Sequence, residues 1–140
     1  MEDVDNSDII KTVLTNMLNI SQRKSSDVNS FTMMDNILKN LSQQYDFLRF
    51  VHVNNTRFKE EKDAVQVSDN VNNVDANMLG RAIQDIVTTM TESLGSSAGF
   101  YFIKELQRRL GEDYNTLLED IGVDLSIMQL EFEVINRMKK

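Results

Sequence analysis

Apolar positions recur at helical spacing near the start of the chain and predict two helices. After Asn6 and Ser7, which are favourable N-cap residues, apolar side chains recur every three or four positions. This first face consists of Ile9, Ile10, Val13, Leu14, Met17 and Leu18. A second face with the same spacing consists of Met33, Met34, Ile37, Leu38 and Leu41. A short polar loop separates the two faces, so we expect a helical hairpin.

The pattern changes after residue 46, where it favours strands. Aromatic and β-branched residues are frequent from Phe47 to Val53, and Asn54 with Asn55 marks a turn after them. Residues 64–67 alternate between apolar and polar side chains, as a second strand would. We therefore expect one short antiparallel β-hairpin. It must pack on the helices, because an isolated two-stranded hairpin is only marginally stable.

Three glycines divide the rest of the chain into helices. Gly95, Gly111 and Gly122 each follow an apolar pattern of helical spacing, at the position where many helices end in a left-handed residue. Asp75 is a favourable N-cap for the first of these helices, and Asp124 for the segment after the third glycine. The sequence therefore predicts a C-terminal bundle of about four helices.

The segment after Asp124 fits two patterns. Ile127, Leu130, Val134 and Met138 form one stripe of a helix, whereas residues 130–134 also alternate as a strand would. The N-cap and the basic residues from Arg137 onward favour the helix, because both suit the helix dipole.

The fold class that follows is mainly α (α+β). It combines the N-terminal helical hairpin, the short antiparallel β-hairpin and the bundle of about four helices. We expect an N-terminal arm over residues 1–45 and a second unit over residues 46–140. The alternative is a single domain over residues 1–140, which is an ordinary domain size.

The composition of the chain limits the classes of partner that we expect it to bind. The formal net charge of −7 disfavours binding to a phosphate backbone, which requires clustered Lys and Arg. Apolar runs stay far short of the roughly 18 residues of a membrane span, and the first residues are acidic rather than basic as in a signal peptide. Cys is absent, so no disulfide and no thiolate site exists. We expect a cytoplasmic protein without nucleic-acid or membrane partners.

The single histidine offers little chemistry. His52 alternates with Val51 and Val53 in a predicted strand, so it faces solvent if the valines face the core. A Ser–His–Asp relay or a histidine metal site would have to be built around this residue. We expect no catalytic residues, no metal and no cofactor. A metal-dependent hydrolase that uses carboxylates alone stays open as the enzyme alternative.

Two loops resemble ligand sites but lack the required residues. Residues 69–80 are rich in Asp and Asn, yet a calcium loop needs Gly and Glu where this sequence has Val74 and Gly80. Residues 95–99 are small, but no Lys follows them as in a phosphate-binding loop. Gly80 and Gly99 each fall near a helix start, where a missing side chain lets two helices approach closely.

Surplus apolar surface suggests protein binding. A two-helix arm with few neighbours leaves apolar faces exposed, and such patches commonly mark an interface. A symmetric homodimer covers them most simply, so we expect the partner to be the chain itself or another protein. The predicted interface consists of Ile9, Val13, Met17, Ile127, Val134 and Met138. The function predicted is a non-enzymatic interaction or regulatory module.

The alternative function is a small-molecule sensor or carrier. Its apolar pocket would lie between the β-hairpin and the helices of residues 79–110. The residues predicted to line it are Arg81, Met90, Phe100, Ile103 and Lys104, of which the two basic ones supply polar contacts.

Overall fold

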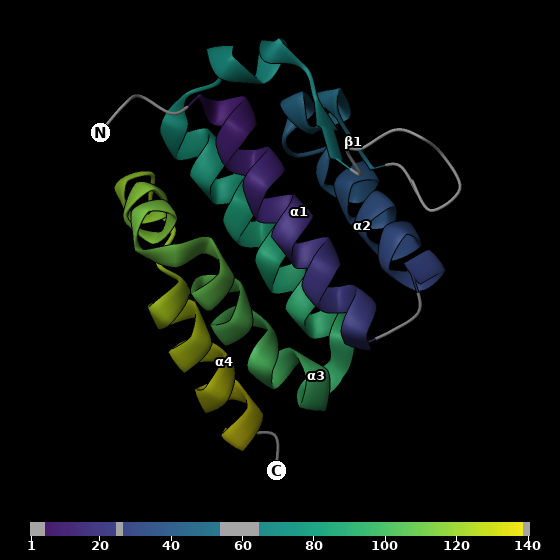
Figure 1. Ribbon diagram of the computed structural model, residues 1–140, viewed down its shortest axis with the longest axis vertical. Coiled ribbons are helices and arrows are strands. Elements are labelled where there is room, and N and C mark those ends of the chain that lie inside the picture. Colours follow the sequence, from purple (N-terminus) through teal and green to yellow (C-terminus); the bar gives the residue numbers. More distant parts are fainter. Residues whose placement is uncertain (1–4, 25–26, 54–64, 139–140) are drawn as a thin grey trace.

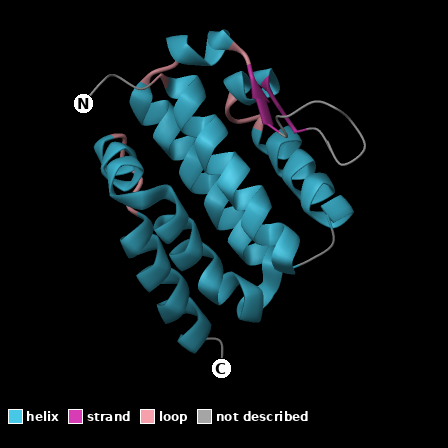
Figure 2. Cartoon of the chain, in the orientation of Figure 1, coloured by secondary structure: helices cyan, strands magenta, loops and turns pink. Residues whose placement is uncertain are grey.

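The computed structural model describes residues 5–24, 27–53 and 65–138, and the chain is mainly helical (Figure 2). In chain order the elements are α1 (Asn6–Lys24), α2 (Asp27–Leu41), the 3-10 helix η1 (Asp46–Phe50), β1 (Val51–Val53), β2 (Val65–Val67), the 3-10 helix η2 (Asp69–Asn73), α3 (Ala76–Asp120) and α4 (Leu125–Met138). This order confirms the predicted fold class. The segment that fitted both patterns is a helix, and Asp124 Oδ1 accepts a hydrogen bond from the backbone N–H of Ile127 at 3.1 Å.

Two glycines break α3 into three helical segments, residues 76–94, 96–110 and 112–120. Gly95 has φ 89° and Gly111 has φ 80°, values that side-chain-bearing residues rarely adopt. Gly122, with φ 94°, separates the third segment from α4. The helix ends predicted at these three glycines are confirmed. With α4, the segments make the expected bundle of four helices.

Helix α1 lies in the middle of the molecule, with α2 and the strands on one side and α4 on the other (Figure 1). It packs against α3 and also contacts α2 and β2. A single hydrophobic core extends from Ile9 in α1 to Met128 in α4. An arm with few neighbours therefore does not form, and this corrects the expectation for residues 1–45. Periodicity predicted the apolar face of α1, but the face is covered within the chain.

The start of α1 is held by η2 and by Val74, the residue that follows η2. Asn6 donates its amide N–H to the backbone carbonyls of Val71 at 3.2 Å and Val74 at 2.7 Å. The backbone N–H of Ser7 donates to Asn72 Oδ1 at 2.9 Å. An unpaired N–H at the helix start is thus satisfied from a distant segment. The Asn-rich stretch that resembled a calcium loop has this structural role.

The β-hairpin is shorter than the sequence predicts. β1 and β2 pair antiparallel with Val51 opposite Val67, His52 opposite Gln66 and Val53 opposite Val65. The expected strand start at Phe47 is wrong, because residues 46–50 form η1. This turn buries both Phe47 and Leu48, whereas consecutive residues of a strand point to opposite faces. The side chain of His52 is exposed, as predicted.

Two glycines permit close packing in the C-terminal bundle. A Cβ atom at Gly80 would overlap the backbone carbonyl of Ile121. A Cβ at Gly99 would lie 2.5 Å from the Thr91 carbonyl oxygen and 3.1 Å from the Phe132 ring. The expectation that these glycines let helices approach closely is confirmed. Gly80 lets Ile121, at the end of α3, approach the first segment, and Gly99 lets the second segment approach both the first segment and α4.

A buried tyrosine connects the loop after α2 to α3. The hydroxyl of Tyr45 donates to Asp85 Oδ2 at 2.6 Å, and only 6% of the Tyr45 side chain is exposed. The hydrogen bond to the carboxylate, followed by burial, raises the pKa of Tyr45 above its ordinary value of 10.0. The nearby positive charge of Arg81 opposes this shift in part.

The raised pKa of Tyr45 predicts that the folded protein loses stability at basic pH. Because the folded state keeps the phenol protonated, the contribution is complete below about pH 10 and is lost as pH rises through the folded pKa. We expect Tyr45→Phe to lower the free energy of unfolding by about 1.5–3 kcal/mol near neutral pH. Urea unfolding of both proteins from about pH 8 to pH 11 tests this. The difference between them should shrink above pH 10; a constant difference would contradict the prediction.

Candidate functional site

Helix α4 carries apolar side chains around most of its circumference. Leu125 and Met128 on its inner face are buried against α3, being 3% and 7% exposed. On the outer side Ile127, Leu130, Val134 and Ile135 are exposed by 52%, 60%, 52% and 50%. We call these four residues the α4 outer face. A helix that is apolar all round is normally buried on all sides, so this face is the strongest candidate contact surface of the described chain.

Polar contacts hold α4 in this orientation. Gln107 of α3 donates its amide N–H to Ser126 Oγ at 2.7 Å. Lys104 of α3 forms an ion pair with Glu133 at 3.6 Å, and Gln129 within α4 donates to the same carboxylate at 3.1 Å. The contacts of Gln107 and Lys104 join α4 to residues 96–110 of α3. The outer face is therefore presented by a helix that is fixed along one flank.

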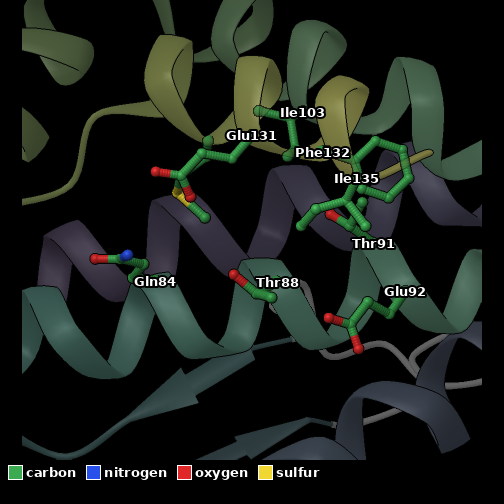
Figure 3. Close-up of a pocket in the computed structure, with 9 residues that line it drawn as sticks. Gln84, Thr88, Thr91, Glu92, Ile103, Glu131, Phe132 and Ile135 are labelled. Atoms are coloured by element: carbon green, nitrogen blue, oxygen red, sulfur yellow. The ribbon is translucent and has the colours of Figure 1, made fainter. Parts of the chain in front are cut away.

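A shallow groove of about 80 Å³ runs between α4 and the first segment of α3 (Figure 3). Its lining comprises Gln84, Thr88, Thr91, Glu92, Ile103, Met128, Glu131, Phe132 and Ile135. Thr91, Ile103 and Met128 are buried and form the floor, while Glu92 and Glu131 are exposed. Ile135 belongs to both the groove and the α4 outer face. The two features are thus parts of one continuous surface.

The groove is acidic. Glu92 comes from α3 and Glu131 from α4, and Lys and Arg are absent from its described lining. Glu133 lies two residues beyond Glu131 and therefore on the opposite flank of the helix, where it pairs with Lys104. The basic side chain nearest in sequence to the groove floor is thus directed to the other side of α4.

The predicted interface is only partly exposed. Ile127 and Val134 lie on the α4 outer face, and the Met138 side chain lies outside the described residues. Ile9, Val13 and Met17, by contrast, are buried in the core, with at most 4% exposed. We correct their assignment, because α3 and α2 already cover α1 within one chain.

Two residues of the surface were absent from the predicted interface. Leu130 is the most exposed of the large apolar side chains that the structure describes, and Ile135 links the outer face to the groove. The signal for Leu130 was present, since it falls on the same helical stripe as Ile127 and Val134. Ile135 joins this surface through the packing of α4 beside α3, which the sequence pattern does not show.

The residues predicted to line a ligand pocket do not come together. Met90 is fully buried in the core, Arg81 is exposed, and Lys104 pairs with Glu133 on the far flank of α4. Ile103 alone of the described members reaches the groove, and the Phe100 side chain lies outside the described residues. The strands pack on α1 and α2 instead of facing residues 79–110. At about 80 Å³, the groove is also far below the roughly 300 Å³ of small-molecule pockets.

Other chemistry is sparse in the described part of the chain. Residues 5–24, 27–53 and 65–138 contain no group of three His, Cys, Asp or Glu side chains arranged to hold a metal ion. Within the same residues, no helix combines the length and the apolar character required to cross a membrane. The exposed His52 lies in β1, which packs on α2 and η1 rather than on α4.

Comparison with protein-family models, with curated proteins and with solved structures finds no match to this chain.

A pair of truncations distinguishes the outer face of α4 from its inner face. We expect Leu130→Ala to change the free energy of unfolding by no more than about 0.5 kcal/mol, because the side chain is exposed. Met128→Ala should lower it by about 2–5 kcal/mol, because it leaves a cavity against α3. Urea denaturation at low protein concentration measures both. A loss of several kcal/mol in Leu130→Ala, independent of protein concentration, would place Leu130 within the fold instead of on a contact surface.

Proposed function

We propose that the protein is a non-enzymatic interaction or regulatory module that binds another protein chain through the α4 outer face. The observation that carries this proposal is the exposure of four large apolar side chains, each by at least half, along one helix. Removing apolar surface from water stabilises a complex by about 25 cal/mol per Å². The proposal includes a cytoplasmic setting, in keeping with a chain that contains no Cys.

The chemistry of the groove supports a binding role over a catalytic one. Its hydroxyl groups belong to Thr88 and Thr91, and the Thr91 hydroxyl donates to the Val87 carbonyl at 2.7 Å. Its titratable side chains, Glu92 and Glu131, come from opposite walls. A nucleophile paired with a base, as acyl-transfer chemistry requires, is not among these lining residues.

Selection from an unbiased library of helical peptides tests the proposal. Peptides selected on the unmodified protein should bind Leu130→Gln at least tenfold more weakly, a loss of about 1.4 kcal/mol, because the change removes apolar contact without adding charge. Met78→Gln is the matched control, since Met78 is also an exposed apolar residue, 40% exposed, in the first turn of α3.

The selection has a clear opposing result. Peptides that bind the wild type and Leu130→Gln equally well, with both variants shown to be folded by circular dichroism, would place the binding surface elsewhere.

A second copy of the chain is the other candidate partner. The spacing of Ile127, Leu130 and Val134 at i, i+3 and i+7 suits the pairing of two α4 helices across a twofold axis. This candidate predicts that the average mass in sedimentation equilibrium rises toward that of two chains between about 10 and 200 μM. Leu130→Gln should then remain monomeric, while Met78→Gln follows the wild type. A wild type that stays monomeric over this range would exclude the second copy.

A further inference from the structure

The groove has the length and the side-chain spacing that suit the binding of a helix. On α3 its lining residues Gln84, Thr88 and Thr91 recur at i, i+4 and i+7, and on α4 Met128, Glu131 and Ile135 recur at i, i+3 and i+7. At 1.5 Å per residue, each wall extends about 10–12 Å along its helix. This length corresponds to about two turns of a helix lying lengthwise in the groove.

Apolar contact is concentrated on the α4 side of this groove. Phe132 and Ile135 line the groove itself, and Ile127 and Val134 continue the apolar surface outward. The α3 wall is polar, with Gln84 and Thr88 exposed along it. An occupant therefore needs one apolar stripe toward α4 and polar side chains toward α3. This is the pattern of an amphipathic helix.

Charge identifies the residues expected beside that stripe. Glu92 and Glu131 line the groove on opposite walls, and neither has a basic partner among the described residues. The whole chain carries a net charge of −7, so the longer-range field has the same sign. Lys and Arg on both flanks of the occupant's apolar stripe would complement these carboxylates.

The same charges disfavour a second copy. A twofold axis through the stripe from Ile127 to Val134 passes close to Glu131, so it would bring the two Glu131 carboxylates near each other. Like charges placed opposite each other destabilise helix contacts and help to exclude wrong partners.

We infer that the groove and the α4 outer face bind an amphipathic helix of a different protein, whose apolar stripe is flanked by Lys and Arg. This inference rests on the proposed function and names the chemistry of the partner. The apolar stripe supplies the contact with α4, and the basic flanks select this partner over neutral or acidic helices.

Three synthetic helical peptides test the inference. They share the same apolar positions and differ at the flanking positions, which carry Lys and Arg, Gln, or Glu. At low salt, the basic peptide should bind the wild type at least tenfold more tightly than the neutral one and at least a hundredfold more tightly than the acidic one. Raising the salt to about 0.5 M should reduce this difference, because the flanking charges are exposed and screened. Fluorescence anisotropy measures all three affinities.

A charge-neutralised variant assigns the selectivity to the groove. Glu92→Gln combined with Glu131→Gln should weaken the basic peptide about tenfold and leave the neutral peptide unchanged. The matched control, Glu112→Gln combined with Glu119→Gln, removes the same charge at exposed positions outside the lining of the groove. It should change the affinity for the basic peptide less than twofold.

Several results would overturn the inference, and they separate it from the proposed function. If all three peptides bind the wild type equally and bind Leu130→Gln more weakly, the inference of a basic partner is wrong, but the proposal that the α4 outer face binds a protein is supported. If the control variant weakens the basic peptide as much as the groove variant, net charge rather than the groove selects it. If the wild type forms a dimer that the basic peptide does not dissociate, the occupant is a second copy. If no peptide binds, the inference that the groove binds a helix is wrong, and the library selection alone decides the proposed function.

Discussion

The placement of α4 depends on close packing at two glycines. At Gly80 the first segment of α3 approaches the Ile121 carbonyl, and at Gly99 the second segment approaches the Phe132 ring of α4. Packed interiors have few voids, so a single added carbon at either position would have to displace backbone or an aromatic ring. The groove exists because these contacts hold α4 beside α3, and the outer face exists because they hold α4 at one rotation.

Hydrophobicity alone would not select that rotation. The inner residues Leu125 and Met128 and the outer residues Ile127, Leu130 and Val134 differ little in apolar character. Shape and polar contacts select between them instead. The Phe132 ring fits where Gly99 has no side chain, and the Glu133 carboxylate pairs with Lys104 of α3. Ser126 is held by Gln107 of α3, so an α4 turned by half a revolution would lose these three contacts with α3. The apolar stripe therefore faces outward because specific packing contacts fix the rotation of α4, and not because the helix is weakly amphipathic.

Local signals in the sequence were sufficient for the helix boundaries and for part of the surface. Gly95, Gly111 and Gly122 require positive φ, and Asp124 caps α4, so residue type alone carries this information. Two failures have physical causes. Periodicity identifies an apolar face but not its neighbour, so Ile9 and Val13 were assigned to an interface although α3 covers them. Aromatic and β-branched residues favour strands on average, yet Phe47 and Leu48 are both buried only by a 3-10 turn.

The groove could not be predicted from the sequence, because its walls are separated by more than thirty residues along the chain. In the sequence, Gln84 and Thr88 are predicted to lie on the polar face of one helix, and Glu131 is predicted to be a solvent-exposed charge on another. When α4 packs beside α3, these residues form the opposite walls of one acidic groove next to the apolar stripe. The stripe alone is compatible with many partners, including a second copy. The two carboxylates narrow that range, since burying them against another acidic surface costs free energy that apolar contact must offset. The apolar area of α4 would thus provide most of the affinity. The carboxylates on both walls would provide the selectivity, because they favour a positively charged partner.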